Sequence, residues 1–239
     1  MTAVSGRPSE PRTIGTRGNR VAPRPCSLCD AVDTAVFFDA SRLPYGRHFF
    51  RCQNCELVFV GEEYLLDLES QKVRYLEHNN QVDDPDYRKF LSRLWTHLKP
   101  LLSVDDRGID YGSGPGPALV AMMRECGFKV ESYDPIFASN PELLQHKYDF
   151  VTCTETVEHF HRPGDEFRRL DTIIEPGGLL GIMTSIVYDI DTFSSWYYMR
   201  DPTHVSFYTP RTMQWIADRM DWRLEMPTKN IAIFQKLGS

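Results

Sequence analysis

The sequence has no apolar run long enough to cross a membrane and no surplus of positive charge. A membrane-spanning helix needs about 20 consecutive apolar residues, and no such run occurs in the 239 residues of the chain. The formal net charge of −6 argues against general binding of nucleic acid or of an anionic membrane surface. The N-terminus also lacks the apolar segment of a secretory signal. Together, these absences predict a cytoplasmic protein.

The first 25 residues contain little that could be buried in a core. They are rich in Arg, Pro, Gly and Ser, which predicts a disordered tail over residues 1–25. The five arginines of this segment could contact an anionic partner, but a solvated tail is the simpler interpretation. The rest of the chain has room for one full domain and a small additional module.

Four of the six cysteines form two C-x-x-C pairs. Cys26 and Cys29 make the first pair and Cys52 and Cys55 the second, with 22 residues between the pairs. This spacing is typical of a structural zinc site in which two knuckles supply four thiolates to a tetrahedral ion. We therefore predict a zinc ribbon over residues 26–60, with metal binding supplying much of the folding energy. Two disulfides are the alternative, which a cytoplasmic location disfavours.

Residues 61–102 have apolar side chains at three- and four-residue spacing. The segments YLLDLESQKVRYLEH and PDYRKFLSRLWTHLKPLL both follow this pattern, which is typical of amphipathic helices. Asp84 before Pro85 is a good candidate for a helix N-cap. We predict a helical connector here, and the polar loop between the two helices could serve as a lid or as a surface turn.

Residues 110–116, DYGSGPG, predict a tight turn between a strand and a helix. A dinucleotide-binding loop is one interpretation, but its G-x-G-x-x-G spacing is not met, because the third glycine comes one residue early. Pro115 and Pro117 also remove two backbone N–H groups that a pyrophosphate would use. The loop therefore favours a nucleoside ligand over a dinucleotide.

This D-x-G-x-G-x-G pattern resembles motif I of the class I S-adenosylmethionine (SAM)-dependent methyltransferases. Later segments resemble the second, fourth and fifth strands of that family and its closing antiparallel pair: FKVESYDP, KYDFVTCTETVEHFHRPGDEFRRL, IIEPGGLLGIMTS, WRLEM and NIAIFQKLG. The resemblance covers residues 70–239. It implies an α/β fold, a Rossmann-like doubly wound sheet over residues 103–239, preceded by the small zinc ribbon.

The resemblance also implies which residues contact SAM. Asp134, at the end of the second strand, corresponds to the acidic residue that takes the ribose hydroxyls. The full set of implied cofactor residues is Asp110, Gly112, Ser113, Gly114, Pro115, Asp134 and Glu155. One departure from the family pattern lies just after Asp134, where residues 135–147 leave no room for both a helix and a strand. The third strand is therefore predicted to be short or missing, and no adenine-contacting residue is predicted.

The segment TETVEHFH, residues 154–161, follows the predicted fourth strand at the sheet edge where open α/β folds bind ligands. If a helix begins at Glu155, then Glu155, Glu158 and His159 share one face. E-x-x-E-H at this point resembles two metal-dependent groups, the O-methyltransferases of ubiquinone synthesis and the enzymes that methylate the terminal 2′-hydroxyl of small RNAs. The RNA enzymes add a histidine from a later loop, for which His204 is the candidate.

This second resemblance implies catalytic roles for Glu158, His159 and His204, and a second divalent-metal site formed by these three residues with Glu155. Two alternatives remain open for the same residues. His159 or His204 could act as a general base without metal, with Glu155 contacting the cofactor. The cluster could instead have only a structural role.

We predict a SAM-dependent methyltransferase that acts on a small-molecule acceptor, at a hydroxyl or an activated carbon. Small-molecule methyltransferases that act on deoxysugar carbons resemble this chain in carrying a four-cysteine module before the catalytic domain. An RNA methyltransferase that grips RNA with the ribbon is one alternative, although the net charge of −6 argues against a nucleic-acid partner. A non-catalytic SAM-binding regulator is another. The sequence determines neither the acceptor nor the oligomeric state.

Overall fold

A computed structural model describes residues 22–43, 45–77 and 80–238, so residues 1–21 of the predicted disordered tail lie outside the described residues. The strands are β1 (Thr34–Asp39), β2 (His48–Cys52), β3 (Val58–Val60), β4 (Arg107–Tyr111), β5 (Lys129–Tyr133), β6 (Tyr148–Thr154), β7 (Ile174–Met183), β8 (Ser206–Phe207), β9 (Trp222–Thr228) and β10 (Ile231–Lys236). The α-helices are α1 (Leu68–Leu76), α2 (Pro85–Leu98), α3 (Ala118–Glu125), α4 (Pro163–Ile173) and α5 (Pro210–Met220). Short 3-10 turns are η1 (Glu62–Tyr64), η2 (Lys99–Leu101), η3 (Pro141–Gln145), η4 (Val157–His159), η5 (Ile190–Ser195) and η6 (Tyr197–Arg200).

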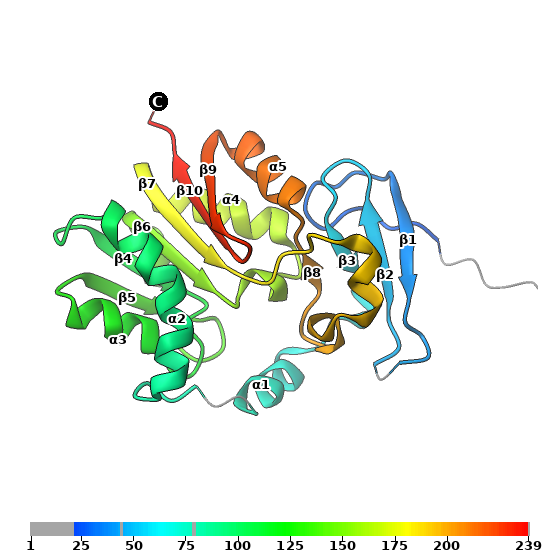
Figure 1. Ribbon diagram of the computed structural model, residues 1–239, viewed down its shortest axis with the longest axis horizontal. Helices are drawn as coiled ribbons and strands as arrows, with labels where there is room; N and C mark the ends of the chain where they lie inside the picture. The colour runs from blue at the N-terminus through cyan, green and yellow to red at the C-terminus, as the bar shows by residue number, and fades with distance from the viewer. Residues whose placement is uncertain (1–21, 44, 78–79, 239) are drawn as a thin grey trace, which may run out of the picture.

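The larger sheet has the strand order β5-β4-β6-β7-β10-β9. Its first four strands are parallel, and β10 and β9 join antiparallel at the far edge. Helices α2 and α3 pack against one face of this sheet, and α4 and α5 against the other (Figure 1). This three-layer arrangement confirms the predicted Rossmann-like methyltransferase fold.

The predicted loss of the third strand is also confirmed. Strand β5 is the edge of the larger sheet, and no strand pairs beyond it in the part of the chain that the structure describes. Residues 135–147 form η3 and an isolated bridge between Asp134 and Ala138 instead of a helix and strand. The ligand-binding end of β5 is therefore followed directly by a short loop.

Helix α2 forms where the connector was predicted to be helical. The Asp84 side chain accepts hydrogen bonds from the amides of Asp86 and Tyr87, and Pro85 occupies the first helical position. These contacts satisfy amide groups that have no partner within the helix. The apolar side of the helix, including Leu94 and Leu98, is buried against the larger sheet. Among the described residues, no helix combines the length and apolar character needed to cross a membrane.

A smaller sheet with the order β1-β2-β3-β8 contains the N-terminal module. Three of its strands come from the range predicted as a zinc ribbon. The fourth, β8, comes from within the predicted methyltransferase range and pairs antiparallel with β3, with Val58 opposite Phe207. The inner side of the module shares one apolar core with α4 and α5, in which Cys55 and Phe167 are both fully buried. The module is thus joined to the larger domain by both backbone pairing and a common core.

Candidate active site

A cleft of about 1010 Å³ lies at the carboxyl ends of β4, β5 and β6. Helix α1 contributes Gln71 and Tyr75 to its wall, so the predicted connector borders the cleft. All seven residues predicted to contact the cofactor line it: Asp110, Gly112, Ser113, Gly114, Pro115, Asp134 and Glu155. His159 and His204 also line the cleft, whereas Glu158 lies behind its wall with no exposed surface.

The glycine loop is tied to the end of β5 by hydrogen bonds. The amides of Gly112 and Ser113 both donate to the carbonyl of Tyr133, at 2.8 and 3.1 Å. Asp134 accepts a hydrogen bond from the Gly114 amide at Oδ2, over 3.0 Å. Its Oδ1 accepts from the two amides that follow it, those of Ile136 and Phe137. The Asp134 carboxylate therefore fixes the loop and the β5 end relative to each other.

We expect Gly114→Val to abolish SAM binding while the protein stays folded. Gly114 has a φ of +66° and no atom within 4 Å of where a Cβ would stand, so valine would meet backbone strain and would occupy the open cleft. Gly177→Val is the matched control, because Gly177 also has a positive φ and free space but lies in β7 away from the cleft. Isothermal titration measures the Kd for SAM of both variants. If Gly114→Val binds SAM as tightly as Gly177→Val does, the assignment of the loop is wrong.

Asp110 is buried at the end of β4. Burial raises its pKa from the ordinary value of 3.8 to about 7, and the charge of Asp134 adds to the rise. The hydroxyl of Thr152 donates a 2.6 Å hydrogen bond to Asp110 Oδ1, which partly opposes the shift. Between these two pKa values the folded protein holds a proton that the unfolded chain has released, so the free energy of unfolding falls as pH rises from about 4 to about 7.

Asp110→Asn is therefore expected to stabilise the protein more at high pH than at low pH. The amide keeps an oxygen for Thr152 and cannot ionise, so the cost of a buried charge disappears. Thermal melts at about pH 5 and about pH 8 test this, and the Tm of the variant should fall less than that of the parent between them. Asp218→Asn, at an exposed position on α5, is the control. If the Tm of Asp110→Asn falls as much as that of the parent between the two pH values, Asp110 is not a buried, neutral group.

The segment TETVEHFH does not begin a helix at Glu155, contrary to expectation. The Glu155 amide extends the pairing of β6 by donating to the carbonyl of Met183, and its φ of +47° is left-handed. The chain then makes the single turn η4, and α4 begins only at Pro163, a residue favoured at the first helical position. Glu155 and Glu158 are therefore not neighbours on one helix face.

The structure nevertheless brings Glu158, His159 and His204 together. One potential ligand atom from each lies within 4.8 Å of the others, and the two imidazole ring centroids are 4.9 Å apart. His159 Nδ1 lies 3.0 Å from the carbonyl of Thr203, and His204 Nδ1 lies 2.7 Å from the carbonyl of Tyr198. Because a carbonyl only accepts, Nδ1 carries the hydrogen in both rings and Nε2 of a neutral ring keeps its lone pair.

Glu158 is held by donors rather than by cations. Its Oε2 accepts a 2.9 Å hydrogen bond from Thr184, and its Oε1 accepts from the hydroxyl of Tyr198. Glu155 does not join the three-residue group, but its Oε2 lies 3.2 Å from the oxygen of the same Tyr198 hydroxyl, whose single hydrogen is donated to Glu158. Burial, with the nearby charge of Glu158, raises the pKa of Glu155 to about 9. Burial also lowers the pKa of His204 to about 4, so this imidazole is neutral at pH 7.

Sequence reasoning missed Tyr198, which lies between Glu155 and Glu158, and Thr184, which donates to Glu158. Thr184 follows β7, at the same sheet edge as Glu155. The rule that predicted ligands at strand ends would have indicated Thr184. Tyr198 lies in η6, six residues before His204 in the chain, and no spacing in the sequence indicates that it reaches Glu158.

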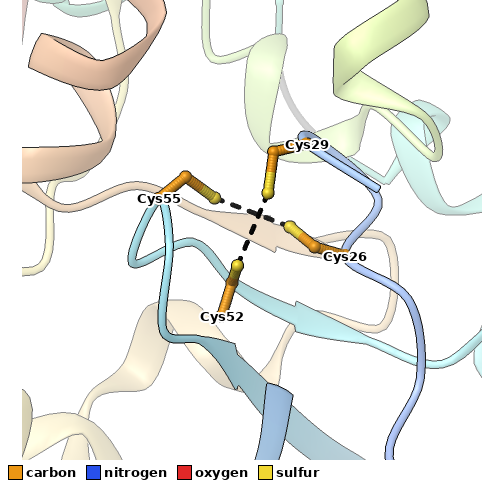
Figure 2. A group of neighbouring side chains, drawn as sticks. All are labelled: Cys26, Cys29, Cys52 and Cys55. Carbon is orange, nitrogen blue, oxygen red and sulfur yellow. Dashed lines mark hydrogen bonds between the residues drawn. The ribbon is translucent and has the colours of Figure 1, made fainter. Parts of the chain in front are cut away.

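The four cysteine sulfurs of the N-terminal module point toward a common centre (Figure 2). They all lie within 4.8 Å of one another, and the Cys26–Cys55 and Cys29–Cys52 sulfur pairs are each 3.5 Å apart. All four are free thiols in this structure. The hydrogen bond from Cys55 lowers the pKa of Cys26 to about 6, which favours a thiolate at this position.

The first cysteine knuckle packs directly against the start of α4. The Gly164 amide lies 3.4 Å from the carbonyl of Ser27, and a Cβ on Gly164 would stand only 2.4 Å from the carbonyl of Leu28. Glycine is therefore required for this close approach. Helix α4 follows η4, which carries Glu158 and His159, so the first cysteine knuckle packs against the chain just beyond these residues.

A family profile described as "Methyltransferase domain" matches residues 76–225 of the chain. Among curated proteins, the ubiquinone biosynthesis O-methyltransferase of Pseudomonas savastanoi pv. phaseolicola is 36% identical over 72 residues, which cover 30% of this chain and 31% of that protein. The protein of the same name from Pseudomonas syringae pv. syringae matches equally. The match thus spans about a third of the length of these relatives.

Two solved structures illustrate the structural similarity. A SAM-dependent methyltransferase from Archaeoglobus fulgidus is 19% identical, with 58% of this chain and 71% of that chain covered and a TM-score of 0.47. The 1,6-didemethyltoxoflavin-N1-methyltransferase of Burkholderia thailandensis is 12% identical, with 77% and 97% covered and a TM-score of 0.47. Because the family profile matches more than half of the sequence, the chain belongs to the methyltransferase domain family, and the prediction of a SAM-dependent methyltransferase is confirmed at the level of the family.

Proposed function

We propose that this protein transfers a methyl group from SAM to a hydroxyl oxygen of a small-molecule acceptor. The single observation that carries the proposal is the arrangement of the cleft. The glycine loop lines one part of it, and His159 and His204, backed by Glu158, line another. Methyl transfer needs mainly the alignment of donor and acceptor and the removal of one proton. An activated carbon acceptor, also predicted, needs the same alignment, but the local match to ubiquinone O-methyltransferases favours oxygen.

On the donor side, SAM would lie over the glycine loop. Gly112, Ser113, Gly114 and Pro115 give it backbone without bulky side chains. Asp134 would accept from a ribose hydroxyl through the lone pair of Oδ2 that its three amide donors leave free. Glu155, with its raised pKa, would be protonated at pH 7 and able to donate a hydrogen bond. Asp110 would support the loop from behind.

On the acceptor side, the donor set of Glu158, His159 and His204 fits a divalent metal. Neutral imidazole nitrogens together with a carboxylate suit Mn²⁺, Fe²⁺ or Zn²⁺, and also Mg²⁺ with added water. A hydrogen bond from Nδ1 to a backbone carbonyl, present in both histidines, is the usual way to orient metal-binding imidazoles. A bound ion would supply Lewis acidity that lowers the pKa of the acceptor hydroxyl. Glu155, also predicted as a ligand, is better assigned to the cofactor because it stands outside the group.

The side chains around the cleft would orient Glu158 and the two histidines and, without a metal, accept the proton of the acceptor hydroxyl. Tyr198 and Thr184 hold the Glu158 carboxylate in one orientation by donating to its two oxygens. If no metal takes part, the free Nε2 of His159 or His204 is placed to accept the hydroxyl proton as a general base. In both cases the imidazole tautomers set by Thr203 and Tyr198 are required.

We propose in addition that Cys26, Cys29, Cys52 and Cys55 bind one structural zinc ion. Four thiolates at the zinc–sulfur distance of about 2.3 Å stand about 3.8 Å apart around a tetrahedral centre, and the 3.5 Å sulfur pairs are close to this. Four protein ligands leave no open position, so the ion would have no direct part in catalysis. The domain boundaries and the cytoplasmic location inferred from sequence stay predictions.

The proposal is tested with SAM that carries a labelled methyl group. The purified protein is incubated with small metabolites and, separately, with RNA from cells, and the labelled product is followed. We expect label in the small-metabolite fraction. If label appears only in RNA, the methyl acceptor is RNA and the small-molecule proposal is wrong. SAM binding without label in either fraction would favour a regulator without turnover.

A further inference from the structure

Arg47, between β1 and β2, is a buried cation whose side chain is 4% exposed. Its hydrogen-bond acceptors are backbone carbonyls of one later segment. Nη1 donates to Pro202 O (3.1 Å) and His204 O (2.8 Å), and Nη2 donates to Met199 O (2.6 Å) and Asp201 O (2.8 Å). Burial lowers the pKa of Arg47 to about 10, while the charge of Asp201 opposes the shift, so the guanidinium is a cation at pH 7.

This contact uses both terminal nitrogens of the guanidinium. Each terminal nitrogen of a guanidinium carries two N–H groups, and all four are donated here. The fork is planar and fixed, so the four carbonyls must take one arrangement around it. A lysine ammonium has three N–H groups on a single nitrogen and cannot reproduce this set. The chain from Tyr198 to His204, which we call the carbonyl loop, is therefore wrapped around Arg47, and the side chain of Asp201 adds contacts to Arg74 and Thr203.

The carbonyl loop in turn orients the histidines of the cleft. His204 belongs to the loop, and its Nδ1 bonds to the carbonyl of Tyr198. His159 lies outside the loop, but its Nδ1 bonds to the loop carbonyl of Thr203. The hydroxyl of Tyr198 also donates to Glu158. Every contact that fixes the tautomer of the two imidazoles thus comes from the segment wrapped around Arg47.

We infer that Arg47 is a positioning residue for methyl transfer, through which the N-terminal four-cysteine module sets the orientation of His204 and His159. The inference rests on the proposed function for the part that concerns turnover, but the coupling between Arg47 and the imidazoles is a separate physical claim. Arg47 is far from these residues in sequence, and its hydrogen bonds go to backbone carbonyls, so its effect passes through the backbone of the carbonyl loop. The module would then have a part in catalysis beyond stabilising the fold.

Arg47→Lys is the test, because it keeps the charge and the aliphatic stem but loses the fork. The first readout is ¹⁵N NMR of the full-length protein labelled at histidine, with His204 assigned from the His204→Gln spectrum. We expect the parent to show His204 protonated at Nδ1, and Arg47→Lys to shift it toward the Nε2–H form that imidazole prefers in water. Hydrogen exchange of the backbone amides in residues 199–205, other than Pro202, should accelerate in the same variant, while the glycine loop stays protected.

The second readout is the rate of label transfer from SAM into the small-metabolite fraction. We expect Arg47→Lys to lower the apparent kcat by about 10- to 100-fold, the size of effect that displacement by about 1 Å produces, with the KM for SAM unchanged. Arg51→Lys is the matched control. Arg51 is an arginine of the same module that pairs with Glu56 on its surface, and its replacement should change neither readout.

The possible results distinguish the coupling of Arg47 to the imidazoles from the proposed methyl-transfer function. The inference is overturned if Arg47→Lys shows the same His204 tautomer and the same amide exchange in the carbonyl loop as the parent. It is also overturned if Arg47→Lys transfers label at the rate of the parent while His204→Ala is inactive. Full activity of His204→Ala would leave His159 as the only candidate base. Full activity of both His204→Ala and His159→Ala, or no label transfer by the parent, would overturn the proposed function, while the NMR result still judges the coupling. If Arg47→Lys does not fold, Arg47→Gln is measured in the same way. Failure of both to fold would make Arg47 a requirement of the fold and reject the positioning role.

Discussion

His204→Ala is expected to lower turnover by about 10²- to 10⁴-fold, the usual contribution of a group that handles the acceptor proton, with SAM binding retained. The ring of His204 lies 4.9 Å from that of His159 and next to Glu158, on the cleft wall. SAM is expected to lie on the glycine loop, which His204 does not contact in the described structure. The rate of label transfer at saturating SAM and the Kd for SAM together check this prediction.

His161→Ala is the matched control, because His161 lies two residues after His159 and is not part of the three-residue group. A loss of turnover in His161→Ala as large as in His204→Ala would point to a general disturbance of the cleft instead of a specific role for His204. If metal is bound, a chelator should also remove activity, and Mg²⁺, Mn²⁺ or Zn²⁺ should restore it. Activity that survives chelation, together with an inactive His204→Ala, would assign His204 as a metal-free base.

Cys52→Ser is expected to remove one tightly held zinc ion per chain and to lower the Tm of the whole protein. Structural zinc contributes on the order of 10–16 kcal/mol to folding in small zinc modules, which is as large as the whole stability of a typical domain. Cys52 is fully buried, and the core around it continues into α4 and α5. Loss of the metal should therefore destabilise both parts in a single unfolding transition, measured by calorimetry and metal analysis.

Cys126→Ser is the control for this experiment. Cys126 is exposed and lies outside the four-cysteine cluster, so zinc content and Tm should both match the parent. A Cys52→Ser protein that keeps its zinc would show that the metal is held elsewhere. Two separate transitions, with only the first shifted by Cys52→Ser, would contradict the shared core.

The features that the sequence predicted well depend on short stretches of chain. The glycine loop follows from residues 110–116, because positive φ angles at Gly112 and Gly114 are a local property of glycine. Three other features are also encoded locally. Residue spacing defines the C-x-x-C pairs, adjacent residues define the cap at Asp84, and the length of residues 135–147 excludes the third strand. The order of these segments was enough to indicate the fold and to place Glu158 and His159 after the carboxyl end of a central strand.

Predictions from neighbouring residues failed where tertiary contacts set the backbone conformation. The helix expected from Glu155 does not form, because the Glu155 amide pairs with Met183 and the chain turns at a left-handed residue. The meeting of His204 with His159 was predicted only from a resemblance, since the sequence places the two far apart. In the structure, the carbonyl loop and the pairing of β8 with β3 bring His204 to the cleft.

The sequence by itself determined the local turns and the residue types available for chemistry, and the site residues it indicates stay predictions, because residue type and local spacing limit what a side chain and its turn can bind. Only the tertiary structure decided how these residues are held. Tyr198 bridges the two acidic residues, and Arg47 gathers four carbonyls of a distant loop. Such contacts join segments far apart in the chain, and they arise only when packing of the core brings the segments together, so no local pattern encodes them.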